Sequence, residues 1–455
     1  LYEQLLDKIS GTEEYLFNLA AVYLYLKDYD KALSTYGRAE KSLGLTEQIA
    51  YQRQKIYLEL NQPDKAIEES RKLIAHFPDN FDYVLQMADI LISNKRQSEA
   101  TRVLQQLLAE HPEVSAARLK LADIYWQDNQ IDRFREELIT AFQDSTLHIN
   151  AKINTLMRYM TYLPNATLQK LIPQLADMVA ARHPDNSNAY LIQGDVYSAF
   201  IEKELLPPGK VEKAKKAARQ AYATYVRMQP DNFSVWQNLL NLELQLNMND
   251  SLQLHADQAL ELFPNQPWLY LINGIAQLQA GHYRQAAQTL EAGRRRAANN
   301  RKLLIMFYSY LGDIYHELKE HEKSDRAYEA ALDLDPFNYT VLNNYSYYLS
   351  LRGEKLDKAA KMSTELIRNN PDNNTFLDTY AWVQYALGNY EEARRVFEKI
   401  IASGVTEGIY YDHYGDTLYQ LGLVDEAVEQ WKKARELDQN LENIDQKIAQ
   451  RKIIQ

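Results

Sequence analysis

The stretch YYDHYGDTLYQLGLVDEAVEQWKKA, residues 410–434, sets small and aromatic residues at fixed intervals among helix-forming residues. The segment LDTYAWVQYALGNYEEARRVFEKI, residues 377–400, repeats the same spacing 34 residues upstream, so that Ala427 aligns with Ala393. Self-similarity at a period of about 20–50 residues indicates a solenoid or another repeat array. The stretch is therefore one copy of a repeated unit, and the other copies decide the fold.

The alanine column continues through almost the whole chain. Successive positions are 34 residues apart in most steps, 35 apart once, 38 apart twice and 46 apart once. Eight of the twelve positions are Ala and one is Ser, which ordinary residue usage would not supply. The positions are Ala32, Ala66, Ala100, Phe134, Ile172, Ala218, Leu252, Ala286, Ser324, Ala359, Ala393 and Ala427.

Two further columns follow the same register. Twelve residues before the alanine lies a small residue in most copies, and twelve residues after it lies a proline in seven copies. Each copy also has two segments with apolar residues at i, i+3, i+4 and i+7, the pattern of amphipathic helices. We name these helix A and helix B, and Gly422 follows helix A of the last copy, where a left-handed cap conformation favours glycine. The small column includes Ala20, Ala88, Ala122, Gly194, Gly274, Gly312, Ser346, Ala381 and Gly415, and the proline column is Pro78, Pro112, Pro184, Pro230, Pro264, Pro336 and Pro371.

These columns resemble the tetratricopeptide repeat (TPR) family over about residues 13–440, and they are most similar to long TPR arrays of Gram-negative bacteria. The resemblance implies an all-α, right-handed superhelical solenoid of about twelve helix-turn-helix repeats. We expect N-terminal repeats over 1–150, irregular repeats over 151–232 and C-terminal repeats over 233–440. A capping helix is expected over 441–455, because Leu441, Ile444 and Ile448 form one apolar stripe on a polar segment.

The register is least regular in the middle of the chain. The sixth copy carries about twelve extra residues, including LLPPGK at 205–210, and Pro207-Pro208-Gly209 is expected to form a turn. We predict a longer helix A, a protruding loop at about 198–212 and a longer helix B. Insertions in repeats map to one face and sometimes bind ligands, although a tolerated surface loop explains this one equally well.

Composition excludes several classes of function. The net charge of −11 argues against a general nucleic-acid binder, which needs a basic face. Cysteine is absent, which removes disulfides and thiol chemistry, and no apolar run of about 18 residues could span a membrane. Because the first residue is Leu1 within an apparent helix, we expect the natural N-terminus to lie further upstream. A bacterial periplasmic or envelope location is favoured, and a cytoplasmic one stays open.

Catalytic and metal-binding motifs were sought without success. The chain has no GxGxxG, GxxxxGK[ST], GxSxG or HExxH motif. His316 and His321 are five residues apart, and on one helix they would point about 140° away from each other. The sequence therefore predicts no enzyme, no cofactor and no metal.

The remaining candidate is the concave face, which the family resemblance assigns to helix A. We number each copy so that the small residue is position 8 and the alanine is position 20, which places positions 5, 9 and 12 on that face. Position 5 is apolar in the early copies, where we expect Leu85 and Leu119 to be core, and polar in the last four. The candidate groove combines carboxylates with aromatic anchors that would suit a protein or extended peptide, with a basic partner favoured. It consists of Asp313, Asn343, Tyr347, Asp378, Trp382, Tyr385, Asp412, Asp416 and Tyr419.

Other interpretations stay open. Asp follows the small residue in several copies, so it could be a solvent-exposed residue that recurs with the repeat rather than a ligand contact. The carboxylate clamp of chaperone-binding TPR proteins wants Lys at position 5 and Asn at position 9, a combination that no copy has. A carbohydrate-binding or carbohydrate-processing envelope protein is the alternative function, although catalysis would need one buried carboxylic acid with a raised pKa. The third interpretation is that this sequence is a helical arm of a larger chain.

Overall fold

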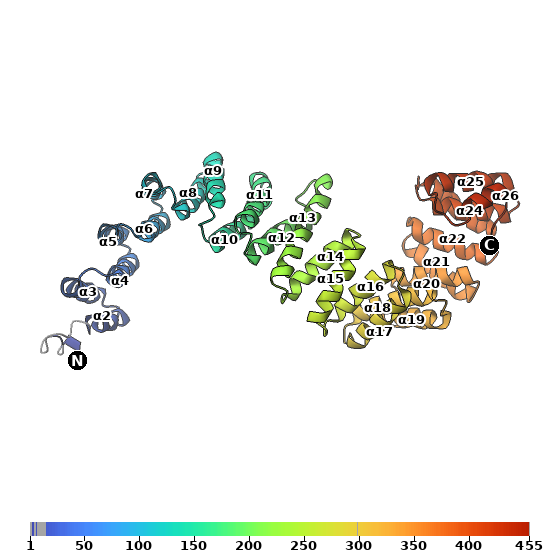
Figure 1. The fold of residues 1–455 in the computed structure, drawn as a ribbon, viewed down its shortest axis with the longest axis horizontal. Coiled ribbons are helices and arrows are strands. Elements are labelled where there is room, and N and C mark those ends of the chain that lie inside the picture. Colours follow the sequence, from blue (N-terminus) through green and yellow to red (C-terminus); the bar gives the residue numbers. More distant parts are fainter. Residues whose placement is uncertain (1, 4–5, 7–14, 298, 455) are drawn as a thin grey trace. The chain divides into compact units, whose positions relative to one another are not determined.

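In a computed structural model, which describes residues 2–3, 6, 15–297 and 299–454, all regular elements of the described chain are helices (Figure 1). The chain divides into two compact units, unit 1 from Leu1 to Pro230 and unit 2 from Asp231 to Gln455. Unit 1 contains α2 (Tyr15–Tyr25), α3 (Tyr29–Leu43), α4 (Glu47–Glu59), α5 (Pro63–His76), α6 (Asp82–Ser93), α7 (Gln97–Glu110), α8 (Ser115–Gln127), α9 (Ile131–Gln143), α10 (Ile149–Met160), α11 (Ala166–Arg182), α12 (Ser187–Glu202) and α13 (Pro208–Met228).

Unit 2 continues the same alternation of helices. It contains α14 (Phe233–Gln245), α15 (Asn249–Leu262), α16 (Pro267–Gln279), α17 (Tyr283–Arg296), α18 (Arg301–Glu317), α19 (His321–Leu334), α20 (Tyr339–Arg352), α21 (Leu356–Asn369), α22 (Asn374–Ala386), α23 (Tyr390–Ala402), α24 (Gly408–Gln420), α25 (Val424–Leu437) and α26 (Ile444–Gln450). Every even-numbered helix from α2 to α24 packs against the helix that follows it. The described residues thus contain the twelve A/B pairs that the sequence predicts, and the expected all-α repeat architecture is confirmed.

The turn between helices A and B has the same backbone conformation in most copies. Five residues before the alanine column, the backbone takes a positive φ, as at Gly422 (φ 78°). Glycine accepts this left-handed conformation without a steric penalty, whereas other residues do so at a cost that asparagine tolerates best. The non-glycine residues in this column are Lys27, Asn61, Lys95, Asn129, Asn247 and Lys319.

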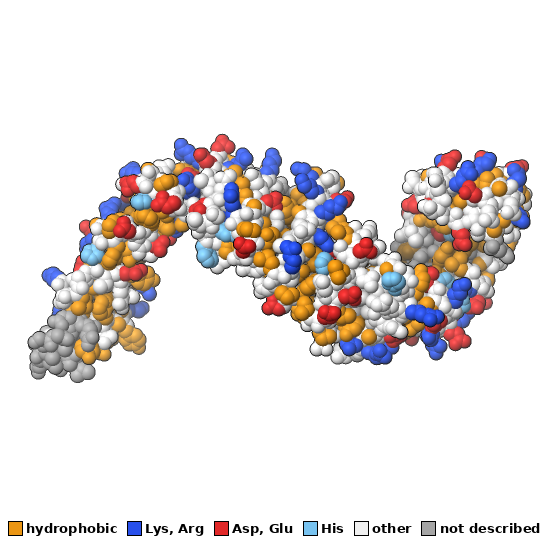
Figure 2. Space-filling view, in the orientation of Figure 1, with side chains coloured by type: hydrophobic (Ala, Val, Ile, Leu, Met, Phe, Trp, Pro, Cys, Tyr) orange, Lys and Arg blue, Asp and Glu red, His pale blue; other side chains and the backbone are white. Residues whose placement is uncertain are grey.

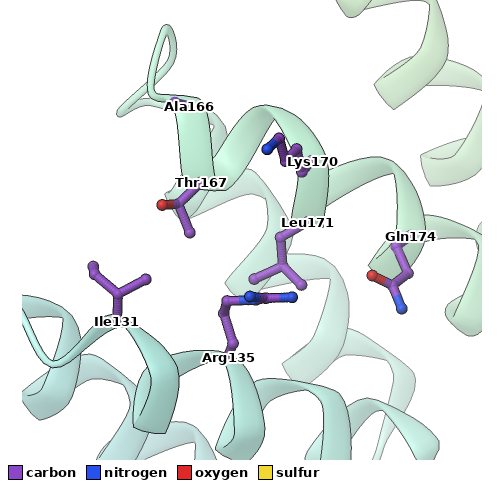
Figure 3. Close-up of a pocket in the computed structure, with 7 residues that line it drawn as sticks. All are labelled: Ile131, Arg135, Ala166, Thr167, Lys170, Leu171 and Gln174. Atoms are coloured by element: carbon purple, nitrogen blue, oxygen red, sulfur yellow. The ribbon is translucent and has the colours of Figure 1, made fainter.

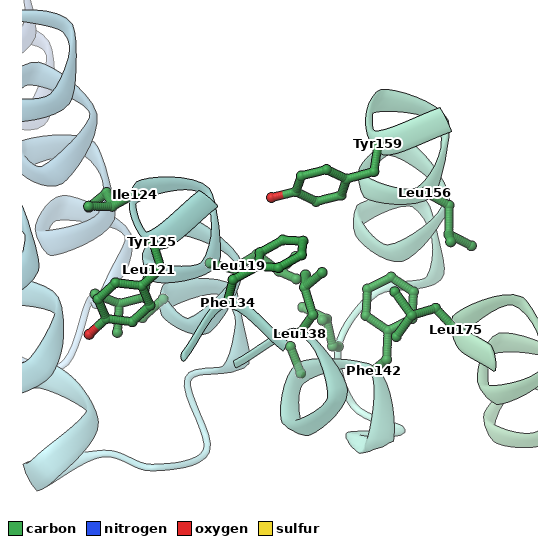
Figure 4. Packing of buried hydrophobic residues seen from close by; sticks show 14 of the residues in the cluster. Leu119, Leu121, Ile124, Tyr125, Phe134, Leu138, Phe142, Leu156, Tyr159 and Leu175 are labelled. Carbon is green, nitrogen blue, oxygen red and sulfur yellow. The ribbon is translucent and has the colours of Figure 1, made fainter. Parts of the chain in front are cut away.

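The irregular fourth copy remains well packed. Phe134 stands in the alanine column and is fully buried, with its ring 4.9 Å from Trp126 and 5.1 Å from Tyr159 of the next copy. Figure 4 shows Phe134 and Tyr159 in one apolar cluster with Leu138 and Phe142. The large side chain at this position is accommodated by packing against aromatic rings of its own copy and of the next one.

The insertion in the sixth copy lengthens both helices, as predicted. Helix α12 has 16 residues and α13 has 21, and only residues 203–207 lie between them. Leu205 and Leu206 of this connection are partly buried against the core of unit 1. The extra residues are therefore mostly helical, and the protruding loop is shorter than expected.

The surface mixes both signs of charge. In the face shown in Figure 2, basic and acidic side chains are interspersed on each unit rather than gathered by sign. None of the described helices is long and apolar enough to cross a membrane.

Candidate functional site

The nine candidate groove residues lie on four helices A of unit 2. Asp313 is on α18, and α20 carries Asn343 and Tyr347. Helices α18 and α20, α20 and α22, and α22 and α24 are in contact, so the candidates form one continuous face. The remaining candidates are Asp378, Trp382 and Tyr385 on α22 and Asp412, Asp416 and Tyr419 on α24.

The carboxylates of this face are not solvated, which corrects the sequence-based expectation. The exposed fractions of Asp378, Asp412 and Asp416 are 8%, 7% and 6%. A buried carboxylate needs a paired charge or hydrogen-bond donors. Each of the three acids has such partners within the chain, so none is free to attract a ligand over a long distance.

Asp412 and Asp416 share one ammonium group. Lys447 Nζ, from α26, lies 2.9 and 3.0 Å from the two carboxylate oxygens of Asp412 and 2.9 Å from Oδ2 of Asp416. The indole Nε1 of Trp431 donates a second hydrogen bond to Asp416, at 2.9 Å. Burial raises the pKa of Asp416, although Lys447 opposes the shift. Burial alone would lower the pKa of Lys447, but Asp416 and Asp412 outweigh it and raise the pKa, so the lysine is charged.

Asp378 is paired with His413 of the next repeat. Nδ1 of His413 lies 2.9 Å from Oδ1 of Asp378, and both side chains are buried. Burial would lower the pKa of His413, but Asp378 outweighs it and raises the pKa above its ordinary value. Asp378 therefore favours the protonated form of His413, and the Nδ1–H of the ring donates to its carboxylate.

The aromatic candidates are stacked and half-buried rather than freely exposed. Trp382 lies between two rings, with centroid distances of 4.6 Å to Tyr385 and 4.0 Å to His413. The planes of Trp382 and Tyr385 differ by only 2°. Tyr347 and Tyr419 are also half-buried. These rings are fixed in place and keep part of their surface exposed.

The pairing of helix-A carboxylates recurs along the array. The side chain at position 6 of one helix A reaches a carboxylate at position 9 or 5 of the preceding helix A, and we call this the inter-repeat polar contact. It joins two helices A that are not consecutive along the chain. The contacts are Lys120 to Asp89, Arg158 to Asp123 (2.6 Å), Asn344 to Asp313 (3.2 Å), His413 to Asp378 (2.9 Å) and Lys447 to Asp412 and Asp416 (2.9 Å each).

The aspartate after the small residue also has a role within its own repeat. Tyr222 donates to Asp195 at 2.9 Å and Trp431 donates to Asp416, in each case from position 24 of helix B. The small residue makes room for that ring, since a Cβ on Gly415 would lie 2.5 Å from Trp431. Tyr328 and Asp313 form the same pair over Gly312. In these three copies the aspartate is therefore a structural group, whereas Asp89, at the same position of an earlier copy, is exposed.

Sequence reasoning missed the two basic side chains of this site. His413 and Lys447 are 34 residues apart, so both occupy position 6, and extending the register past residue 440 would have found the second one. The geometry expected for His316 and His321 was also wrong, because α18 ends at Glu317. Their ring centroids lie 5.8 Å apart on two helices, and His316 stacks on Tyr348. In the described residues no three His, Asp or Glu side chains gather as a metal site would require.

The apolar side chains at position 5 of unit 1 vary in exposure. Leu119 is buried, as expected of a core residue, whereas Leu85 is only partly buried. Tyr51 and Met157, at the same position of other copies, are 56% and 57% exposed. Position 5 therefore presents apolar surface in part of unit 1.

Unit 1 also has a surface pocket of about 320 Å³ between α9 and α11. Arg135 of α9 and Lys170 of α11 line it together with Thr167 and Leu171 (Figure 3). Both cationic side chains are exposed, and no acidic residue lines the pocket. It lies on helices B, apart from the helix-A candidates.

Comparison with known proteins agrees with this repeat structure. Sequence models described as "Tetratricopeptide repeat" match residues 13–42, 57–113, 98–145, 267–292, 308–338, 348–406 and 379–441, together more than half of the chain. The TPR repeat-containing protein YpiA of Bacillus subtilis is 21% identical over 421 residues, which cover 92% of this chain and 94% of YpiA. The TPR repeat-containing protein PA4667 of Pseudomonas aeruginosa is 24% identical over 196 residues, 42% of this chain and 32% of that protein.

Two solved structures match this chain at low sequence identity. The APC/C hetero-tetramer Cut9-Hcn1 gives a TM-score of 0.42 at 13% identity, with 97% of this chain and 90% of that one covered. The structure of yeast Tom70 gives a TM-score of 0.41 at 14% identity, with 97% of this chain and 95% of Tom70 covered. The repeat register, the helix pairs and the sequence matches lead to one conclusion: the chain belongs to the tetratricopeptide repeat family.

Proposed function

We propose that the chain is a non-enzymatic scaffold that binds a protein or an extended peptide on the helix-A face of unit 2. The observation that carries this proposal is a row of half-exposed rings on successive helices A, namely Tyr347, Trp382, Tyr385 and Tyr419. Aromatic side chains are favoured anchors at interfaces because they bury much surface and lose little conformational entropy. Stacking on His413 and Tyr385 already restrains Trp382, which reduces the entropy that a ligand would have to overcome.

Asn343 supplies a polar group for the same ligand. Its Oδ1 is buried and has no hydrogen-bond partner among the described residues. An unsatisfied buried acceptor is costly and calls for a donor, which a bound peptide backbone N–H or a water molecule would supply. An extended peptide lying across α20 and α22 would therefore meet several aromatic side chains, and it would reach this acceptor once the side chain of Asn343 turned outward.

The acids take a different role in this proposal from the one first expected. Asp313, Asp378, Asp412 and Asp416 hold neighbouring helices in register and position the rings, and they contact a partner only if their present donors are displaced. Long-range attraction therefore does little to favour a basic partner. Such a partner is favoured because its basic side chains could replace the present hydrogen-bond donors of these aspartates. The net charge of −11 supports a partner other than nucleic acid.

A carbohydrate ligand is the second candidate. The observation in its favour is the parallel Trp382–Tyr385 pair, in which the outer face of Tyr385 is of the kind on which a sugar ring can stack. Carbohydrate processing has weaker support, because Lys447 is bound to both Asp412 and Asp416, the two carboxylates that would act as acid and base.

The test is a pull-down from the native source followed by titration of the captured partner. The Trp382→Ala/Tyr385→Ala variant and Asn343→Ala should each bind more weakly while keeping wild-type helicity. Lys361→Ala is the control, because Lys361 is exposed on α21, the helix B of the same repeat as Asn343. Unchanged affinity in the double aromatic variant would refute the groove. Binding of oligosaccharides, lost in the same variant, would favour the second candidate.

A further inference from the structure

Helix α26 stands where the first helix of a thirteenth repeat would begin. Lys447 lies 34 residues after His413 and makes the same contact to the preceding helix A that His413 makes. Ala449 falls in the small-residue column, yet it is exposed, whereas Ala381 and Ala122 in that column are fully buried. In the described residues no helix B covers α26.

The apolar attachment of α26 is small, and two exposed ion pairs, Arg435 with Asp445 and Arg451 with Asp425, also join this segment to α25. The helix has seven residues, and Ile444 is its one buried apolar side chain, with Leu441 and Ile448 partly buried beside it. Its two flanking residues, Asn443 and Arg451, have positive φ values of 57° and 54°, and the N-cap side chain makes no capping hydrogen bond. Helices this short are not stable by themselves in water, so α26 keeps its structure through docking.

The surface beneath α26 is a binding site for one cation. Asp412 and Asp416 are four residues apart on α24 and direct their carboxylates to the same ammonium group. Two buried like charges at this spacing repel each other unless a cation lies between them. A lysine suits the site better than an arginine, because a compact ammonium can approach oxygens of both carboxylates at once.

We propose that Asp412 and Asp416 form a lysine-binding site at the end of the groove, and that α26 occupies it as a detachable segment that a partner's lysine replaces. This proposal rests on the proposed function of the groove and adds the chemistry of its ligand. A partner segment would occupy the opened site. Like α26, with Ile444 and Lys447, it would carry an aliphatic residue three positions before a lysine. While α26 is docked, Lys447 keeps Asp412 and Asp416 from a partner's lysine, so the contact is autoinhibitory at this end of the groove.

The test uses the full chain and a labelled synthetic peptide with the sequence of residues 441–455. An open variant, Ile444→Asp/Lys447→Gln, removes both the apolar contact and the ammonium of the tethered helix. We expect the peptide to bind the open variant saturably and the wild-type chain at least about tenfold more weakly, because tethered α26 competes. A peptide with Lys447→Gln should bind the open variant at least about tenfold more weakly than the parent peptide, because it leaves both carboxylates unpaired. Adding Asp412→Asn/Asp416→Asn to the open variant should remove binding.

Equal binding of the two peptides, or equal binding by the wild-type chain and the open variant, would overturn the proposal. Amide hydrogen exchange on the wild-type chain keeps the proposal testable if the open variant does not fold. Residues 444–450 should exchange much faster than α24, through an opening that leaves α24 and α25 protected. Exchange of α26 only together with α24 would show that the segment does not detach. Neither result decides whether the groove binds a partner, which the pull-down tests separately.

Discussion

Replacing Gly415 by alanine tests whether the small residue of helix A leaves space for the aromatic ring of helix B. A Cβ at this position would lie 2.5 Å from Cδ1 and Nε1 of Trp431 and 3.1 Å from the carbonyl oxygen of Ala427. Because Trp431 is fully buried, its ring cannot move aside freely. Overpacking of this kind costs about 1–3 kcal/mol. Displacing the indole from Asp416 adds about 0.5–1.5 kcal/mol.

The gain in helix propensity offsets only about 1 kcal/mol of that cost. We therefore expect Gly415→Ala to destabilise the last repeat by about 1–3 kcal/mol. Gly37→Ala is the matched control, because Gly37 lies within α3 and a Cβ there meets nothing within 4 Å. It should stabilise its helix by up to about 1 kcal/mol.

The measurement is amide hydrogen exchange over residues 409–437 in Gly415→Ala and over residues 29–43 in Gly37→Ala. Exchange reports local opening, which suits a repeat protein whose units need not unfold together. Urea unfolding followed by circular dichroism checks the overall helix content. Unchanged or slower exchange around residue 415 in Gly415→Ala would refute the close packing between position 8 and position 24.

Three further predictions follow from the repeat register and the buried pairs. Ala393→Trp should destabilise the array by about 1–3 kcal/mol or more, because Ala393 is fully buried. Lys216→Trp, on an exposed face, should not destabilise it, and equal melting temperatures of the two variants would contradict this prediction. The pKa of His413 is raised in the folded chain, so its contribution to stability is complete below the unfolded value of about 6.5 and disappears as the pH rises through the folded value. Urea titrations of the wild-type chain and His413→Asn across that range should converge at high pH, and a constant difference would contradict the assignment. Asp378→Asn should reduce stability with little dependence on salt, because the pair is buried, and a loss that salt abolishes would place it at the surface.

The sequence was sufficient for the fold because each repeat carries its own register. The alanine and small columns mark where helices cross closely, and proline marks where helix B ends. Even the sixth copy, which has the largest departure from the period, followed the prediction of longer helices. Phe134 shows the limit of the pattern, since a buried ring in the alanine column depends on Trp126 and Tyr159 in two different copies.

The site was less predictable because exposure depends on neighbouring repeats. The residues at positions 5 and 9 were correctly placed on one face, but a single copy does not show what covers that face. Asp412 and Asp416 are buried by α26, whose short polar sequence gives a weak helical signal. The same uncertainty affects Tyr51 and Met157, which belong to an apolar column and are nevertheless exposed.

Site-specific photo-crosslinking in the native source tests the central claim most directly. A photoreactive residue is placed at Tyr347, on the proposed binding face of α20, and in a separate chain at Lys361, on α21 of the same repeat. The proposed groove predicts a discrete polypeptide adduct from position 347, lost when Trp382 and Tyr385 are replaced by alanine, and no such adduct from position 361. The same adduct from both positions, or an adduct from position 361 alone, would contradict binding on the helix-A face.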